Sequence, residues 1–148
     1  MVYALLISLL LILVTFYVHF FIIKMLSRAV PQINISNHHQ VLLIVLALFM
    51  AHILEASIYA VAYDISISYL NLGSLQGATI STFMEYLYYS IVMYTSLGLG
   101  EVYPLGHVRF ITGLEALNGL LLISWSASFT FLVMKRIWPW NQDDAKHN

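Results

Sequence analysis

The chain lacks cysteine and is poor in charged residues. Its 148 residues include no cysteine, which excludes disulfides, thiolate metal sites and thiol nucleophiles but leaves the compartment undecided. Charged residues make up 9% of the sequence, against about 25% in soluble globular proteins, so an ordinary soluble domain is excluded. A net charge of −1, without a basic stripe carrying interleaved aromatic residues, argues against a nucleic-acid partner.

Sequence patterns that would support an enzyme are also missing. No Ser-His-Asp arrangement, phosphate-binding Gly-Lys pattern or His-Glu-x-x-His motif points to catalysis. The stretch from His52 to Glu55 lacks the second histidine that a zinc motif of this kind needs. We therefore expect no enzymatic activity, no small-molecule substrate and no cofactor.

What the chain has in excess is apolar residues. They make up 61% of the sequence and give a mean hydropathy of +0.84, which places the chain in a bilayer. About 20 apolar residues cross the hydrocarbon core. Three runs have that length: residues 2–23, 41–63 and 108–132. A shorter, aromatic-rich run over 78–94 is interpreted as a half-helix that enters the membrane and returns, after a loop over 64–76. The sequence thus predicts an all-α membrane protein.

Basic residues indicate how the helices are oriented. Lys24 and Arg28 follow the first apolar run, whereas a signal peptide has its positive flank before the run, so residues 2–23 are interpreted as a retained transmembrane helix. Apart from Arg109, the other basic residues follow the third run. The positive-inside rule then puts the N-terminus outside and the C-terminus in the cytoplasm. This assigns Lys135, Arg136 and Lys146 to the cytoplasm, Trp138 and Trp140 to the inner interface, and Asp64, Glu85 and Glu101 to the outer side.

Two glycines, Gly98 and Gly100, lie one residue apart between the half-helix and the third span. Because glycine adopts left-handed backbone conformations at little cost, a segment with glycine at alternate positions can turn successive carbonyls toward one axis. This is the geometry of a potassium filter. The alternative is that the two glycines only make a tight turn between helices.

These residues resemble the pore-loop potassium channels, in which two spans flank a pore loop. The matching segments are Tyr88-Tyr89-Ser90, the run from Tyr94 to Pro104, Arg109 at the start of the inner helix, and Gly119. The chain is also similar to small bacterial three-span ion channels with His-x-x-Glu before the pore. The resemblance covers about residues 41–134. It implies a homotetramer in a plasma membrane that passes K⁺ passively. It also implies a peripheral helix and loop (1–40), a pore domain (41–136) and a short tail (137–148).

The resemblance assigns the filter to residues 95–100. It implies that Ser96, Leu97, Gly98 and Leu99 bind K⁺ through their backbone carbonyls, with the Ser96 hydroxyl innermost. Thr95 and Gly100 lie at the two ends of the filter segment. The resemblance assigns the outer mouth to Glu101, Tyr103 and Arg109. The family usually has Thr, Val and Tyr where Ser96, Leu97 and Leu99 stand, and Asp where Glu101 stands. Because of these departures, a weakly selective Na⁺/K⁺ channel or a non-conducting assembly protein are the alternatives.

The third span is expected to line an inner cavity. Gly119 is a candidate bend, and one helical face carries the candidate cavity and gate residues Leu120, Ile123, Ala127 and Phe131. The alternative is that Gly113 and Gly119 only let helices approach closely. The sequence does not decide whether Glu115 faces the permeation path or is buried against a neighbour.

His52 and Glu55 share a face of the second span and are expected to bond each other. Val92 stands where many family members have an acidic residue behind the filter, so one hypothesis makes Glu55 the substitute brace. The alternative is a buried polar pair that orients helices. Exposed histidines near the two membrane surfaces, His38, His39 and His107, are candidate proton sensors. Haem ligation by His19 and His52 is disfavoured because their expected depths in the membrane differ.

Overall fold

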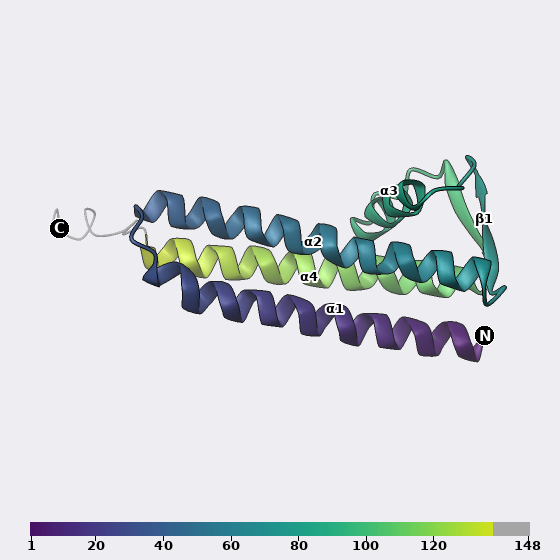
Figure 1. Cartoon of the computed structure of the whole chain (residues 1–148), viewed down its shortest axis with the longest axis horizontal. Coiled ribbons are helices and arrows are strands. Elements are labelled where there is room, and N and C mark those ends of the chain that lie inside the picture. Colours follow the sequence, from purple (N-terminus) through teal and green to yellow (C-terminus); the bar gives the residue numbers. More distant parts are fainter. Residues whose placement is uncertain (138–148) are drawn as a thin grey trace, which may run out of the picture.

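Three long helices form the body of the molecule. The computed structural model describes residues 1–137 and consists mainly of α1 (Val2–Ala29), α2 (Asn37–Ser68) and α4 (Val108–Ile137), with a 3-10 turn over Val30–Gln32 after α1. They run side by side, and the N-terminus lies at the opposite end of the bundle from residue 137 (Figure 1). Each is long and apolar enough to cross a membrane, so the three predicted spans are confirmed.

The end of the bundle near the N-terminus carries a shorter helix and a small sheet (Figure 1). Helix α3 spans Phe83–Tyr94, and strands β1 (Gly73–Gly77) and β2 (Val102–Gly106) pair antiparallel, with Gly73 opposite Gly106 and Gly77 opposite Val102. The loop predicted over 64–76 is therefore wrong at both ends. Helix α2 continues to Ser68 because Ile67 packs against the core, and the loop's last residues enter a strand whose partner lies far along the chain.

The half-helix predicted from residue 78 begins only at Phe83. A capping box sets this start: Glu85 accepts hydrogen bonds from the backbone N–H groups of Ser81 (2.6 Å) and Thr82 (2.7 Å). These backbone donors lower the pKa of the Glu85 carboxyl. Residues 78–82 therefore stay non-helical and lead from the sheet into α3.

Helix α1 packs on α2 and α4 of its own chain. One stripe of mostly small or polar residues makes this contact, at spacings of three and four that keep them on one helical face: Ala4, Ser8, Leu11, Thr15 and His19. The remaining faces of α1 are large, apolar and exposed, as expected for contact with lipid. The first span thus lies against the other two long helices of its own chain.

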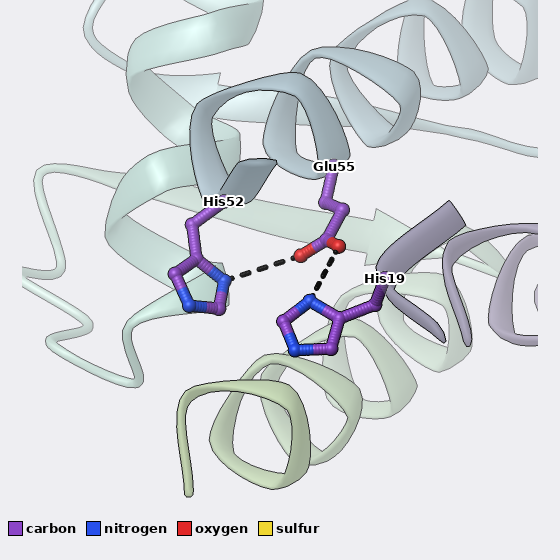
Figure 2. Close-up of side chains that lie close together, drawn as sticks. All are labelled: His19, His52 and Glu55. Atoms are coloured by element: carbon purple, nitrogen blue, oxygen red, sulfur yellow. Dashed lines mark hydrogen bonds and ion pairs between the residues drawn. The ribbon is translucent and has the colours of Figure 1, made fainter. Parts of the chain in front are cut away.

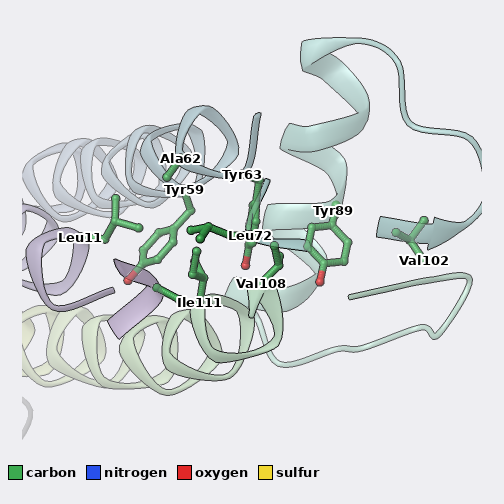
Figure 3. Packing of buried hydrophobic residues seen from close by; sticks show 10 residues of the cluster. Leu11, Tyr59, Ala62, Tyr63, Leu72, Tyr89, Val102, Val108 and Ile111 are labelled. Carbon is green, nitrogen blue, oxygen red and sulfur yellow. The ribbon is translucent and has the colours of Figure 1, made fainter. Parts of the chain in front are cut away.

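The main apolar core lies between the helices at the sheet end of the bundle. Tyr63 of α2 meets Tyr89 of α3 there, and the same cluster includes Tyr59 of α2, Leu11 of α1 and Ile111 of α4 (Figure 3). The Tyr63 and Tyr89 rings pack edge to face at 5.1 Å. This core fixes α3 against the bundle and so positions the segment that follows it.

Candidate functional site: the glycine loop and its polar supports

The glycine loop, residues 95–101, leaves the C-terminal end of α3. The backbone φ angle is positive at every second residue: +59° at Ser96, +55° at Gly98 and +81° at Gly100. Residues with positive φ therefore alternate with residues whose φ is not positive, which turns successive carbonyls away from the alternating directions of a β-strand. The loop begins as a continuation of the helix end, because the N–H groups of Leu97 and Gly98 both donate to the Val92 carbonyl.

Little of this chain covers the glycine loop. Leu97 is 63% exposed and Leu99 is 56% exposed. A Cβ atom built on Gly98 or Gly100 meets no atom within 4 Å. A hydrogen bond of 3.3 Å from the Ser96 hydroxyl to the Ala116 carbonyl joins the loop's first turn to α4. The segment assigned to the filter is thus attached at its base and open over the rest of its length.

The outer side of the glycine loop is tied back to α3. The Tyr88 hydroxyl donates a hydrogen bond to the Glu101 carboxylate, and this bond raises the pKa of Tyr88. The Glu101 carbonyl accepts a bond of 3.0 Å from the N–H of Ala78. Tyr103 lies exposed in β2, and Arg109 lies exposed in the first turn of α4. Of the residues assigned to the outer mouth, Glu101 is therefore the one held by α3.

His52 and Glu55 do bond each other, at 3.2 Å, and a third side chain joins them (Figure 2). His19 of α1 places its Nδ1 atom 2.9 Å from the same carboxylate. The Tyr94 hydroxyl, at the last residue of α3, donates to Glu55 at 2.5 Å. Glu55 therefore links α1, α2 and the helix end from which the glycine loop starts. The sequence contained no signal for the part played by His19.

The expected difference in depth between His19 and His52 is wrong. Helix α1 continues to Ala29, so His19 lies well inside it, level with the middle of α2. The two imidazole rings stack with centroids 5.3 Å apart. Stacked rings do not approach one iron atom from opposite sides, so the geometry itself still disfavours haem ligation.

Glu115 is fully buried within its own chain, which answers the question that the sequence left open. Its carboxyl contacts the Ser90 hydroxyl of α3 at 2.5 Å and accepts a hydrogen bond from the Tyr63 hydroxyl of α2. Ser90 also contacts the Ala56 carbonyl at 2.7 Å. This polar cluster joins α2, α3 and α4 in the interior, where water cannot satisfy the hydroxyl groups.

Gly119 lies where α4 passes the end of α3. A Cβ atom at this position would lie 2.0 Å from the Tyr94 carbonyl oxygen, so the side-chain-free backbone is what allows the contact. Gly119 thus lets α4 approach the end of α3 closely, as the alternative to a bend predicts. Among the proposed cavity residues, Leu120, Ala127 and Phe131 are exposed on this chain, and Ile123 is partly buried near Tyr94 and Leu122.

The comparison with known families gives a match over most of the chain. A family model described as "Ion channel" matches residues 41–136, which covers the sheet, α3, the glycine loop and nearly all of α2 and α4. The chain belongs to this ion-channel family. The match begins after α1, so α1 lies outside the matched residues. The chain matches no curated protein and no solved structure.

Several residues named from the sequence fall outside the described part of this ion channel. Trp138, Trp140 and Lys146, and with them nearly all of the predicted tail, follow residue 137. Lys24, Arg28, Lys135 and Arg136 lie in the described part, toward the end of the bundle away from the sheet. The charge asymmetry used to orient the ion channel is therefore present in the folded helices.

Replacing Glu55 with glutamine is expected to change the ratio of K⁺ flux to Na⁺ flux severalfold. The amide keeps one acceptor oxygen for the donors His19 and Tyr94 and presents an N–H₂ group in place of the other, which frees the end of α3. Asp64→Asn, in the same helix, is the control, because Asp64 bonds Ser68 at the bundle's end. Liposome fluxes of both ions measure the ratio, and an unchanged ratio would rule out the brace.

Proposed function

We propose that several copies of this ion channel assemble around one axis and pass K⁺ passively through a filter formed by Ser96, Leu97, Gly98 and Leu99. The observation that carries the proposal is the alternation of left-handed residues at 96, 98 and 100. Carbonyl oxygens aimed at one axis replace the water around a dehydrating cation. The family match supports passive ion conduction.

The assembly is a homotetramer in this proposal. One chain supplies a single filter strand, and an ion needs oxygen ligands on all sides, so copies must surround it. The open surfaces of the glycine loop support an assembly, since Leu97 and Leu99 are large apolar residues without cover from their own chain. The exposed face of α4 with Leu120, Ala127 and Phe131 is the candidate lining of the inner cavity.

Helix α3 is suited to a cation site at its end. The C-terminal end of a helix carries a partial negative charge, and the glycine loop begins at that end. The Glu101 carboxylate adds negative charge on the outer side. Both contributions favour cations over anions before any selectivity among cations is considered.

The order of selectivity depends on the departures from the common family pattern. Leucine at position 99 has no hydroxyl to brace the filter, and Ser96 keeps an oxygen. A weakly selective Na⁺/K⁺ channel is the alternative, and it is distinguished by the flux ratio. We place the protein in a bacterial plasma membrane, with the N-terminus outside and the basic ends of the helices in the cytoplasm.

Flux through reconstituted protein tests the proposal, with Gly98→Ala as the decisive variant. Alanine at φ +55° costs about 1–2 kcal/mol per chain in the left-handed conformation, and the cost recurs in each copy. We expect K⁺ flux to fall at least tenfold. Gly113→Ala, the same change in a helical, uncrowded position, is the control. Absence of flux in the unaltered protein would favour a non-conducting assembly protein, and full flux in Gly98→Ala would place conduction elsewhere.

A further inference from the structure

We propose that His19, His52 and Glu55 form a binding site for a divalent transition-metal ion such as Zn²⁺. Each residue offers one ligand atom, and the three atoms lie within 4.8 Å of one another. They come from α1 and α2 and point toward a common centre (Figure 2). The histidine that the His52 to Glu55 stretch lacked in sequence is thus supplied by another helix.

The donor set determines which ions fit. Two imidazole nitrogens and one carboxylate oxygen are typical ligands of Zn²⁺ and neighbouring transition metals, whereas K⁺, Mg²⁺ and Ca²⁺ take oxygen ligands. Two of the three distances between ligand atoms are already short: Nδ1 of His19 lies 2.9 Å from the Glu55 carboxylate, and Nδ1 of His52 lies 3.2 Å from it. Ligands at about 2.1 Å from a shared ion lie up to about 4.2 Å apart, so small side-chain rotations complete the site.

Ser126 supports this assignment because it contacts both histidine rings at the nitrogen that is not bonded to Glu55. Its hydroxyl oxygen lies 3.0 Å from Nε2 of His52 and 3.2 Å from Nε2 of His19. Metal-binding histidines generally use the second ring nitrogen in such a hydrogen bond. With metal on both Nδ1 atoms, each Nε2–H donates to one lone pair of Ser126.

With both rings neutral and no metal bound, the same atoms are less well matched. Neutral rings that donate their Nδ1–H groups toward Glu55 and Tyr94 present two acceptor Nε2 atoms to Ser126, whose hydroxyl has one proton. One of the two Nε2 atoms then receives no hydrogen bond from the Ser126 hydroxyl. A bound divalent ion removes the mismatch and also offsets the negative charge of the buried carboxylate.

An ion has room to enter and to complete its coordination. His52 is 18% exposed. A cavity of about 340 Å³ opens beside it, lined in part by Ile91, Tyr94 and Thr95. The Tyr94 hydroxyl lies 2.9 Å from Nδ1 of His52, so the fourth position of a tetrahedral ion faces this hydroxyl. A bound ion would thereby connect α1 to the end of α3.

Metal binding to purified full-length protein tests the site independently of conduction. Chelator-treated protein in detergent is titrated with Zn²⁺ by calorimetry and with Co²⁺ by visible absorption. Trp125, whose ring centroid lies 5.4 Å from that of His19, reports Co²⁺ through fluorescence quenching. We expect about one ion per chain and a tetrahedral Co²⁺ spectrum.

Variants assign the binding to these residues. His19→Gln and Glu55→Gln should each weaken binding at least tenfold, and Ser126→Ala, which leaves the three ligands in place, should weaken it about tenfold. His39→Gln is the matched control, because His39 is exposed and distant along α2. The proposal fails if the unaltered protein binds no metal, if His19→Gln binds as tightly, or if only His39→Gln reduces binding. None of these outcomes depends on whether the protein conducts ions.

Discussion

Replacing Gly119 with alanine is expected to abolish conduction and to lower stability by about 3 kcal/mol, the upper end of the range for overpacking. The new Cβ atom would lie 2.0 Å from the carbonyl oxygen and 2.8 Å from the carbonyl carbon of Tyr94. Backbone atoms at a helix end cannot rotate away as a side chain can. Helix α3 therefore has to move, and the glycine loop that starts at its last residue moves with it.

Thermal unfolding in detergent and K⁺ flux in liposomes measure the two effects of Gly119→Ala. Gly113→Ala is the matched control on the same helix, because a Cβ atom there meets nothing within 4 Å. Alanine favours a helix over glycine by about 1 kcal/mol, so the control should be as stable as the unaltered protein or slightly more stable. Equal losses in both variants would show that contact with Tyr94 is not the reason.

The second large effect is expected from Glu115→Leu. Leucine fills a similar volume but removes the acceptor for the hydroxyl groups of Ser90 and Tyr63, which are buried at the junction of α2, α3 and α4. Ser90 keeps the Ala56 carbonyl at 2.7 Å and Tyr63 keeps the Thr112 hydroxyl at 3.2 Å, so neither hydroxyl is left without a partner. The loss of two hydrogen bonds to the carboxyl group predicts a loss of stability of about 1–3 kcal/mol.

Glu115→Gln is the control for this prediction. The amide keeps one oxygen to accept a hydrogen bond in nearly the same shape, so we expect less than half of the loss seen with leucine. Thermal unfolding in detergent measures both variants. If the leucine variant is as stable as the unaltered protein, the cluster does not hold the three helices together, and the attachment of α3 rests on the tyrosine core alone.

Hydropathy and glycine spacing predicted a large part of this structure. The three apolar runs form α1, α2 and α4. The length of an apolar run is a local property of the sequence, and it decides whether a helix can span the hydrocarbon core of a bilayer. The left-handed residues at Gly98 and Gly100 were also anticipated from glycine itself. Ser96 also has a positive φ, although serine has no special preference for that conformation. The sequence therefore did not predict the left-handed conformation at this position.

The contacts that the sequence did not predict join residues far apart along the chain. Strand β1 depends on β2, about 30 residues later, and its own residues form no alternating apolar pattern. His19 meets Glu55 only because of the rotation of α1 against α2, which no local spacing determines. The bond between Tyr88 and Glu101 likewise depends on how the glycine loop turns back.

The pairing of β1 with β2 restricts how the helices can move. Gly73 lies opposite Gly106 near the end of α2 and the start of α4, so these two helix ends are kept at a fixed spacing. Residues 78–101 lie between the two paired strands, so the two ends of this segment are held close together. If α2 tilted against α4 about the paired strands, the displacement would grow with distance from them and would be largest at the end of the bundle that bears Lys135 and Arg136.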